Sequence, residues 1–281
     1  MKRATTEMHQ VGRSIPRLEA REKVSGRAEY IHNLRLPGML YGKVFRSTVA
    51  HGRIKSIDVS SAAAVNGVHR VVTAEDVKSV IPNLYYGPIF HDQPILATDK
   101  VRHVGESVAV VLAADPHIAE RAAQLIEVEY EELPAVYDEV EAMKSSSPVV
   151  HEVLKPAGMF PDFQDLAGRR DTNLHLHFKL RRGDVEAAFA KADHVFEHTF
   201  HTTQIMHTPL EPIVTVAEAT DSTLTLHTAS QMVSVVRTEI ARLLGWPENR
   251  VRVKTAFLGG GFGAKTYIKV EAIAAACALL T

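Results

Sequence analysis

The sequence predicts an α+β protein divided into two domains. Its 281 residues exceed the usual size of one hydrophobic core, so two domains of roughly 100–150 residues are expected. The segment from Ser107 to Leu133 has the pattern of a strand, a helix and a second strand, whereas residues 144–170 show no hydrophobic period. We therefore place an N-terminal arm at 1–20, a first domain at 21–143, a linker at 144–170 and a second domain at 171–281.

The composition is typical of a soluble globular protein, with 46% hydrophobic and 23% charged residues. Lys and Arg number 32 against 33 Asp and Glu, so the chain offers no broad basic face to a nucleic-acid backbone. No apolar run approaches the roughly 20 residues of a membrane-spanning helix, and the polar residues after Met1-Lys2-Arg3 do not resemble a signal peptide. We expect a cytoplasmic protein that binds neither nucleic acid nor membrane.

The cysteine and histidine content limits the metal chemistry of the chain. A single cysteine, Cys277, allows neither an internal disulfide nor a cysteine-ligated iron–sulfur cluster held by this chain alone. Among the 15 histidines, His175 and His177 would share one face of a strand, but no third ligand accompanies them at a fixed spacing. We expect no metal bound directly by side chains of this chain, and any iron–sulfur cluster must belong to a partner.

Alternating polar and apolar residues predict the strands of the first domain. Ser107–Ala114 is instead a continuous apolar run, which is typical of a strand covered on both faces. Asp115 followed by Pro116 is typical of a helix N-terminus, and this helix extends to Ile126. The other elements expected in this domain are strands at 41–47, 53–59, 68–72 and 127–132 and helices at 60–66 and 74–80.

The second domain is expected to begin with a short helix at 183–192. Residues at period two then predict a strand: His194, Phe196, His198, Phe200 and Thr202. An amphipathic helix at 233–244 is stopped by Gly245. The remaining elements expected here are strands at 213–219, 223–228 and 250–257 and a final helix at 270–280.

A glycine-rich loop, Gly259 to Thr266, is the most informative segment of the sequence. It follows the strand at 250–257 and leads into the final helix. Four glycines within five positions let the backbone adopt positive φ and bring N–H groups close to a ligand, and a following helix N-terminus adds further donors. The loop is therefore a candidate anion-binding site. A glycine-rich connector without a ligand is the structural alternative.

Two nucleotide-binding motifs compete for this loop. The dinucleotide-binding fingerprint fits Gly259, Gly261 and Ala264, but that motif normally opens a domain and needs an acidic residue about 20 positions further on. The phosphate-loop pattern is nearly matched by Gly259, Lys265 and Thr266, but Ala264 replaces a glycine and no later strand supplies a magnesium-binding aspartate. A phosphate-loop nucleotide-binding protein remains one alternative function.

The same loop resembles that of a known enzyme family. Gly259–Lys265 is similar to the GGGFG(G)K loop of the molybdenum hydroxylases, the xanthine dehydrogenase and aldehyde oxidase family. Further segments resemble this family in collinear order: Lys23–Tyr30, Phe45–Ile54, Val101–Glu106, Glu127–Pro134, Pro209–Pro212, Ala229–Gln231 and Arg250–Val253. The resemblance implies a hammerhead-like α/β domain followed by the first part of a molybdopterin-binding α+β domain.

The resemblance also implies an oxidoreductase that binds a molybdenum-molybdopterin cofactor. Such an enzyme hydroxylates, or reductively dehydroxylates, an aldehyde, an N-heterocycle or an aromatic substrate with water-derived oxygen. Gly260, Gly261, Phe262 and Gly263 would line the cofactor, with Phe262 forming one wall of the pocket. Gln231 would donate its amide N–H to the apical oxo ligand of molybdenum. A non-catalytic scaffold derived from the family is the second alternative function.

The resemblance further restricts the substrate. Purine-oxidising members carry a glutamate where this chain has Thr266, so Thr266 is expected in the substrate pocket and xanthine is not expected as the substrate. Glu211 is expected to organise buried hydrogen bonds and not to act as the catalytic base.

Partner chains are the last implication of the resemblance. Electrons from molybdenum would leave through a [2Fe–2S] subunit and an FAD subunit. Family members carry the catalytic glutamate several hundred residues beyond the glycine loop, so we expect either a longer parent protein or a second molybdopterin-binding chain that carries this glutamate. The pterin is expected as molybdopterin itself or as its cytosine dinucleotide form.

Overall fold

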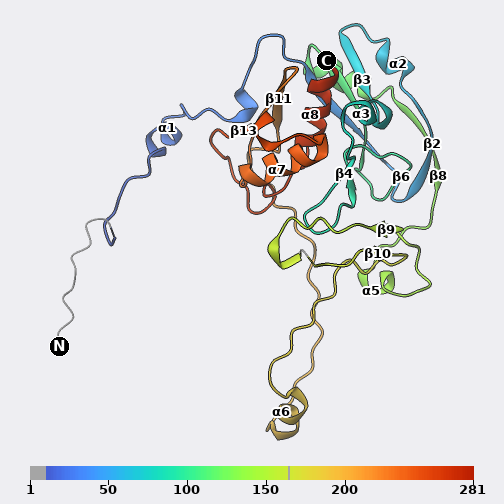
Figure 1. Cartoon of the computed structure of the whole chain (residues 1–281), viewed down its shortest axis with the longest axis vertical. Coiled ribbons are helices and arrows are strands. Elements are labelled where there is room, and N and C mark those ends of the chain that lie inside the picture. The colour runs from blue at the N-terminus through green and yellow to red at the C-terminus, as the bar shows by residue number, and fades with distance from the viewer. Residues whose placement is uncertain (1–10, 164) are drawn as a thin grey trace.

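The computed structural model of the chain describes residues 11–163 and 165–281. Most of its strands gather in one body, from which two segments project (Figure 1). One is the N-terminal segment with α1 (Ala20–Val24), and the other carries α6 (Val185–Lys191) at its tip. Of the arm expected at 1–20, residues 1–10 lie outside the described residues. The mixture of helices and strands confirms the α+β prediction.

The first sheet is built around β7 (Ser107–Ala113), whose residues 108–113 are all buried. It pairs antiparallel with β1 (Tyr41–Arg46) on one side and with β3 (Val68–Val72) on the other. α4 (Pro116–Ala123) packs on this sheet through buried alanines. Asp115 caps the helix because its Oδ1 accepts two backbone N–H groups of the first turn. The continuous apolar run therefore forms a covered central strand, as expected.

A second sheet of the first region contains β2 (Gly52–Asp58) between β6 (Lys100–Val101) and β8 (Glu127–Glu132). Both neighbours run antiparallel to β2. The acids of β8 are exposed, while Val128 and Tyr130 pack on a small core with Val101. The smaller elements of this region are α2 (Ser60–Ala63), α3 (Ala74–Val80), α5 (Glu139–Ala142), a pair of strands β4 (Tyr85–Tyr86) and β5 (Gln93–Pro94), and a 3-10 turn at Ile31–Asn33.

The C-terminal sheet contains β11 (Thr215–Ala219), β12 (Leu224–Thr228) and β13 (Val251–Lys254). β12 and β13 run parallel, so the chain between them crosses over through α7 (Val233–Leu244) and a 3-10 turn at Glu248–Arg250. α7 ends at Gly245, whose φ of 65° suits a glycine C-cap. The last helix, α8 (Glu271–Leu280), contacts β11, α7 and α3.

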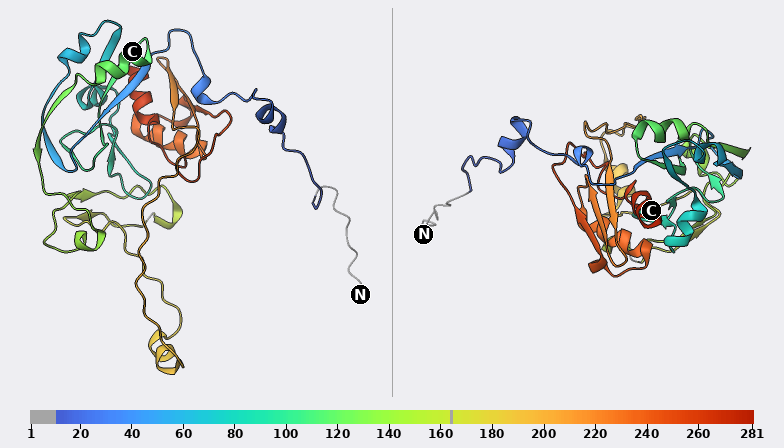
Figure 2. Two further views of the ribbon diagram at one scale, coloured as in Figure 1. Left: turned by 180° about the vertical axis from the view of Figure 1, so that it is seen from behind. Right: turned by 90° about the horizontal axis from the view of Figure 1, so that it is seen from above.

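One hydrophobic core joins the two halves of the chain. Val77 and Ile81 from the first half and Leu226, Ile240 and Ala276 from the second belong to a single buried cluster. Seen from above, α8 lies between the C-terminal sheet and the elements of the first half (Figure 2). Each half therefore buries apolar surface against the other. The domain boundary expected at residues 144–170 stays a prediction.

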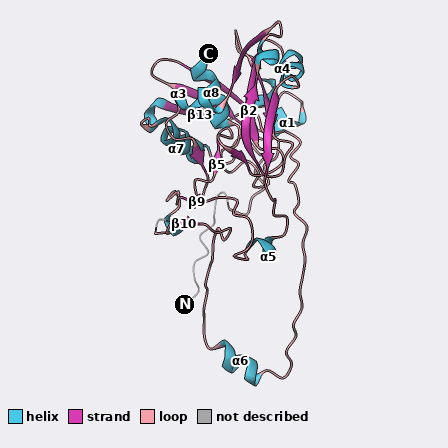
Figure 3. Ribbon diagram, turned by 90° about the vertical axis from the view of Figure 1, so that its right-hand side faces the viewer, coloured by secondary structure: helices cyan, strands magenta, loops and turns pink. Residues whose placement is uncertain are grey.

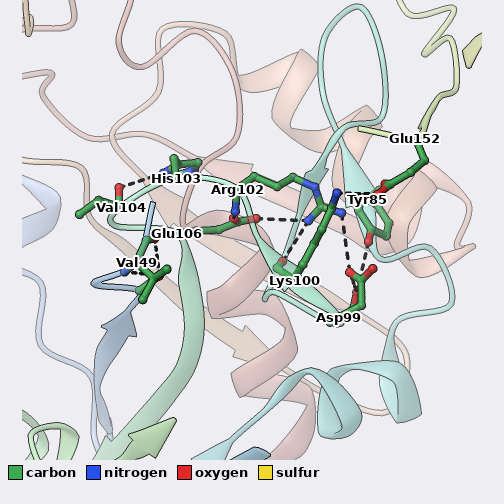
Figure 4. Close-up of polar contacts among 11 residues, drawn as sticks. Val49, Tyr85, Asp99, Lys100, Arg102, His103, Val104, Glu106 and Glu152 are labelled. Atoms are coloured by element: carbon green, nitrogen blue, oxygen red, sulfur yellow. Dashed lines mark hydrogen bonds and ion pairs between the residues drawn. The ribbon is translucent and has the colours of Figure 1, made fainter. Parts of the chain in front are cut away.

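The stretch expected as a linker is anchored to the body. It contains β9 (Val153–Leu154), which pairs antiparallel with β10 (Arg169–Arg170), and a 3-10 turn at residues 161–163. Its Glu152 accepts a hydrogen bond from the buried Lys100 at 2.7 Å (Figure 4). Hydrophobic periodicity predicted neither the β9–β10 pairing nor the ion pair. Two-residue strands are too short to show a period, and the ion pair joins residues 52 positions apart.

Arg102, beside Lys100, is held by a second set of contacts in the same figure. Its side chain is 8% exposed and donates to the carbonyl of Lys100 at 3.1 Å (Figure 4). Its guanidinium also lies 3.8 Å from the carboxylate of Glu106 and 3.7 Å from that of Asp99. Two cations are therefore kept below the surface at the junction of the first region and the linker.

The strand expected at 194–202 is wrong. These residues have no strand pairing and are all exposed. They belong to a long excursion, residues 174–210, which we call the α6 arm (Figure 3). A strand needs a hydrogen-bonding neighbour, and the described residues supply none at this position.

No helix within residues 11–163 or 165–281 is both long enough and apolar enough to cross a membrane.

Replacing Glu152 by alanine is expected to lower the free energy of unfolding by about 1–3 kcal/mol, because the buried Lys100 ammonium loses its carboxylate acceptor. Lys100→Met removes the charge while keeping an apolar side chain, so it is expected to cost less. Urea unfolding followed by circular dichroism compares the two variants. An equal loss of unfolding free energy in both variants would contradict the prediction that the buried ammonium, left without its acceptor, causes the destabilisation.

His151 predicts a pH dependence of stability. Burial, followed by Arg102 and Lys100, lowers the pKa of His151 to about 4. The unfolded chain takes up this proton near pH 6.5, so the stability that His151 contributes is complete above pH 6.5 and is lost as the pH falls toward 4. In His151→Gln, the melting temperature should fall less steeply over this range. His177→Gln, at an exposed position, is the control, and identical slopes in all three proteins would contradict the prediction.

Candidate functional site

The glycine-rich loop between β13 and α8 has an unusual backbone. Gly260, Phe262 and Gly263 have φ values of 100°, 51° and 91°. Glycine adopts this left-handed region freely, but phenylalanine rarely does. The Phe262 side chain is also 71% exposed, so packing within the described chain does not account for its conformation. Strained residues of this kind concentrate at functional sites.

A buried ion pair holds the loop from below. Lys265 is 3% exposed and Glu211 is 7% exposed. The Lys265 ammonium donates to the Glu211 carbonyl at 2.8 Å and to its carboxylate Oε2 at 2.9 Å. The same Oε2 accepts from the backbone N–H of Gly259 at 2.9 Å. Glu211 therefore organises buried hydrogen bonds, in agreement with its expected role.

This ion pair also decides against the phosphate-loop alternative. In that motif the lysine must reach a phosphate, whereas Lys265 is buried and both of its acceptors belong to Glu211. Glycine is required next to the pair, because a Cβ added at Gly259 would lie 2.4 Å from the Cβ of Glu211. The lysine thus fixes the loop and is not available to a nucleotide.

Gln231 lies against the loop, and hydrogen bonds from the loop fix the orientation of its side-chain amide. Its backbone N–H donates to the Lys265 carbonyl at 2.8 Å. Its side-chain Oε1 accepts from the N–H groups of Gly263 at 3.1 Å and Lys265 at 3.3 Å. With Oε1 held by two donors, the Nε2 group remains as the free donor of this side chain. A Cβ at Gly261 would lie 2.4 Å from Oε1, so this approach depends on glycine.

Three consecutive backbone N–H groups of the loop are unpaired among the described residues. The N–H groups of Gly260, Gly261 and Phe262 have no acceptor among the described residues, although Gly261 is buried. Buried backbone N–H groups are nearly always paired in folded proteins. Three adjacent free donors beside one free amide can bind the acceptor atoms of a ligand.

Thr266 follows the loop and uses its hydroxyl within it. Its Oγ1 donates to the Gly263 carbonyl at 2.8 Å. Threonine therefore closes the turn at this position and presents no charge to a ligand.

Residues at the end of the α6 arm also border the loop. A Cβ at Gly260 would lie 3.3 Å from Pro209, and a Cβ at Gly263 would lie 3.8 Å from the Nε2 of His207. His207 was not among the site residues predicted from the sequence. Its position two residues before Pro209 was the available signal.

Two other candidate features do not form sites with the loop. His175 lies 3.3 Å from the carboxylate of Asp92, and no group of three or more metal-binding side chains occurs in the described parts of the chain. A cavity of about 870 Å³ lies between β1, β11 and α8, but none of its lining residues belongs to the glycine loop. Within the cavity lining, burial raises the pKa of Cys277 to about 12, so this thiol is unreactive at neutral pH.

Two family descriptions match the sequence, one in each half. Residues 25–134 match the a/b hammerhead domain of aldehyde oxidase and xanthine dehydrogenase. Residues 167–281 match the molybdopterin cofactor-binding domain. Together these matches include the first sheet, the second sheet and the whole glycine loop.

Relatives agree with these matches. The nicotinate dehydrogenase large molybdopterin subunit of Eubacterium barkeri is 36% identical over 272 residues, which are 96% of this chain and 58% of that subunit. The carbon monoxide dehydrogenase large chain of Afipia carboxidovorans is 37% identical over 89% of this chain and 31% of its own length. Among solved structures, quinoline 2-oxidoreductase from Pseudomonas putida superposes with a TM-score of 0.80 at 34% identity, over 95% of this chain and 33% of that one.

The fold, the loop and these matches therefore define a chain with a molybdopterin cofactor-binding domain. The chain belongs to the molybdenum hydroxylase family of xanthine dehydrogenase and aldehyde oxidase, and it corresponds to the N-terminal part of the molybdopterin-binding subunits. It spans 58% of the nicotinate dehydrogenase subunit and about a third of the other relatives named above.

Proposed function

We propose that this chain provides the first part of the molybdenum site of a hydroxylase. The complete enzyme hydroxylates, or reductively dehydroxylates, an aldehyde, an N-heterocycle or an aromatic substrate with water-derived oxygen. The observation that carries the proposal is the set of free donors on the glycine loop, together with the oriented amide of Gln231. The relatives are named as dehydrogenases and oxidoreductases, so neither the nucleotide-binding alternative nor the scaffold alternative is favoured.

The residues of the loop fit a molybdenum-molybdopterin cofactor. Gly260, Gly261 and Phe262 supply adjacent N–H donors for its polar atoms, and Gly261 has no Cβ to obstruct it. Gly263 contributes the positive φ that turns the loop back toward Gln231. Phe262, with its exposed ring, is proposed as one wall of the pocket. When bound, the cofactor supplies a two-electron acceptor and a metal-activated oxygen source.

Gln231 is proposed as the donor to the apical oxo ligand of molybdenum. Because Gly263 and Lys265 hold Oε1, the amide is fixed before the ligand binds. A donor that is already oriented stabilises a change of charge without reorganising. Gln231 therefore acts in the proposed site by electrostatic stabilisation and moves no proton. The general base is proposed to come from a second molybdopterin-binding chain or segment that carries the catalytic glutamate.

Partner chains complete the proposal. The names of the relatives identify large chains and subunits of larger enzymes. We place a [2Fe–2S] cluster and FAD on separate partner subunits, because the one cysteine of this chain is buried and no single cysteine can hold a cluster. The cofactor is proposed as molybdopterin itself or as its cytosine dinucleotide form.

The proposal is tested by metal and pterin analysis of the chain purified together with its partners. Molybdenum and pterin are expected in equal amounts. Gly261→Ala should lower both, because the new Cβ collides with the Gln231 side chain and displaces the loop together with its free donors. Gly42→Ala, where an added Cβ makes only ordinary contacts of 3.5 Å, is the matched control. Material that contains its partners but neither molybdenum nor pterin would refute the proposal.

Gln231→Ala is expected to reduce turnover roughly 100–1000-fold, which is the effect of removing one oriented donor from an oxyanion hole. Molybdenum content should change little, because the donors of Gly260–Phe262 remain. Steady-state kinetics and metal analysis of the assembled enzyme measure the two effects separately. Gln124→Ala, an exposed glutamine after α4, is the control. Normal turnover with full molybdenum would make Gln231 only a structural part of the loop.

Xanthine is expected to be a poor substrate. The Thr266 hydroxyl is used within the loop and offers no charge to a purine ring. Sites built to hydrogen-bond a polar group discriminate strongly, so kcat/KM for xanthine should be about 100-fold or more below that of the best aldehyde or N-heterocycle. Comparable values for the complete enzyme would show that Thr266 does not decide the substrate.

A further inference from the structure

A short hairpin of the first half lies against the exit of the glycine loop. β4 and β5 form this hairpin, residues 85–94, and β4 contacts α7 (Figure 1). The buried backbone N–H of Gly87 donates to the hydroxyl of Tyr267 at 3.3 Å, and the hydroxyl of Tyr86 donates to the Lys269 carbonyl at 3.4 Å. Tyr267 directly follows the loop. Two hydrogen bonds therefore join the first half of the chain to the segment that leaves the loop.

The turn of this hairpin is tightly constrained. A Cβ added at Gly87 would lie 1.9 Å from a backbone carbonyl oxygen of the same turn, so glycine is required there. The linker holds the other side of the turn. The N–H of His91 donates to the Lys155 carbonyl at 2.8 Å, and the N–H of Ala157 donates to the Ile89 carbonyl at 2.9 Å. The Gly87 N–H is thus presented to Tyr267 from a fixed backbone.

A buried ion pair fastens the hairpin to α7. The Glu239 side chain is fully buried, and its Oε1 accepts from the Nε of Arg242 at 3.1 Å. The same guanidinium donates to the Tyr85 carbonyl at 2.8 Å. Burial, followed by the charge of Glu239, raises the pKa of Tyr267, so this phenol stays protonated at neutral pH. The hairpin, α7 and the loop exit therefore meet at one buried polar cluster.

The last residues of the loop carry the bonds that orient it. Gly263 and Lys265 donate to the Oε1 of Gln231, and they lie four and two residues before Tyr267. On the other side of Tyr267, Ile268 is fully buried in the shared core. Tyr267 therefore stands between a core residue and the oriented part of the loop, and a displacement of its backbone would be passed to the loop donors.

The hydroxyl of Tyr267, and not its ring, makes this connection. The ring centroids of Tyr86 and Tyr267 lie 6.3 Å apart, an aromatic contact that phenylalanine would retain. The phenol oxygen is the acceptor of the buried Gly87 N–H, and buried backbone N–H groups are nearly always paired in folded proteins. Removing the hydroxyl would leave that donor without its acceptor.

We propose that Tyr267 is a positioning residue of the cofactor site, through which the β4–β5 hairpin of the hammerhead region fixes the exit of the glycine loop. The inference rests on the proposed function, because it takes the free donors of the loop to bind the cofactor. It gives the hammerhead region a role at a loop to which it contributes no residue.

Hydrogen exchange in the assembled enzyme tests this role. Tyr267→Phe keeps the ring and removes the acceptor, so the amides of residues 259–266 should exchange about two- to tenfold faster, as expected for the loss of one hydrogen bond. Tyr85→Phe is the matched control, because the Tyr85 hydroxyl forms its 3.2 Å hydrogen bond with Thr98 inside the first half. Both variants should lower the melting temperature by a similar few degrees, but only Tyr267→Phe should loosen the loop. Unchanged loop exchange in Tyr267→Phe would overturn the proposal.

A double-variant cycle isolates the contact itself. Gly87→Ala displaces the turn of the hairpin without altering the phenol. If both residues act through one hydrogen bond, combining Gly87→Ala with Tyr267→Phe should accelerate loop exchange no more than the larger single effect. Single effects that multiply in the double variant would show that the two residues act independently, and the proposal would then be wrong.

A spectroscopic signature separates positioning from a purely structural role. The g values of the molybdenum signal in electron paramagnetic resonance report the surroundings of the metal. They should shift in Tyr267→Phe and match the unmodified enzyme in Tyr85→Phe, with similar molybdenum contents in all three. A Tyr267→Phe enzyme with unchanged g values would contradict a role in positioning the site.

The outcome is separable from that of the proposed function. If the assembly contains neither molybdenum nor pterin, the cofactor assignment falls, while the exchange measurements still decide whether Tyr267 fixes the loop. If the metal is present but Tyr267→Phe behaves like Tyr85→Phe, only the positioning role is wrong.

Discussion

The candidate site depends on one buried interaction, the ion pair between Lys265 and Glu211. Removing one partner of such a pair typically costs 3–5 kcal/mol, because the other charge is left buried without compensation. Here the pair does more than stabilise, since Glu211 also accepts from Gly259 at the start of the loop and Lys265 stands at its end. Both ends of the glycine loop are thus fixed to one carboxylate from a segment about 50 residues earlier. The strained Phe262 between them can persist because its neighbours are held.

The same arrangement divides the donors of the loop into two groups. Gly259, Gly263 and Lys265 direct their N–H groups to side chains of the protein, while Gly260, Gly261 and Phe262 keep theirs free. Satisfied donors position the loop, and the free donors remain available to a ligand. Because the positioning bonds end on Glu211 and Gln231, those two side chains are part of the site even where they touch no ligand. Glycine is therefore required at positions 259 and 261, because a Cβ at Gly259 or Gly261 would collide with Glu211 or Gln231, respectively.

The body of the protein and the α6 arm differ in whether their apolar side chains and polar groups find partners. In the body, strands, helices and the linker bury their apolar residues in shared clusters, and even the buried Lys100 finds a carboxylate. In the arm, apolar side chains and backbone groups lack partners among the described residues. Folding of the described residues thus produces a platform for the loop, while the α6 arm that leads to it is exposed. The two features meet at His207 and Pro209, where the arm joins the site.

Local sequence determined most of the regular elements. The apolar run of β7, the Asp115-Pro116 start of α4 and the glycine stop of α7 each depend on neighbouring residues, so pattern alone predicted them. The loop and Gln231 were also predicted from the sequence, although through resemblance to a family and not through spacing. Tertiary structure alone decided the acceptor of Lys265, the orientation of the Gln231 amide and the pairing of Lys100, because each contact joins residues 30 or more positions apart. It also decided against the strand at 194–202. A period-two pattern specifies an extended chain with two different faces, but a strand forms only where another segment accepts and donates its hydrogen bonds.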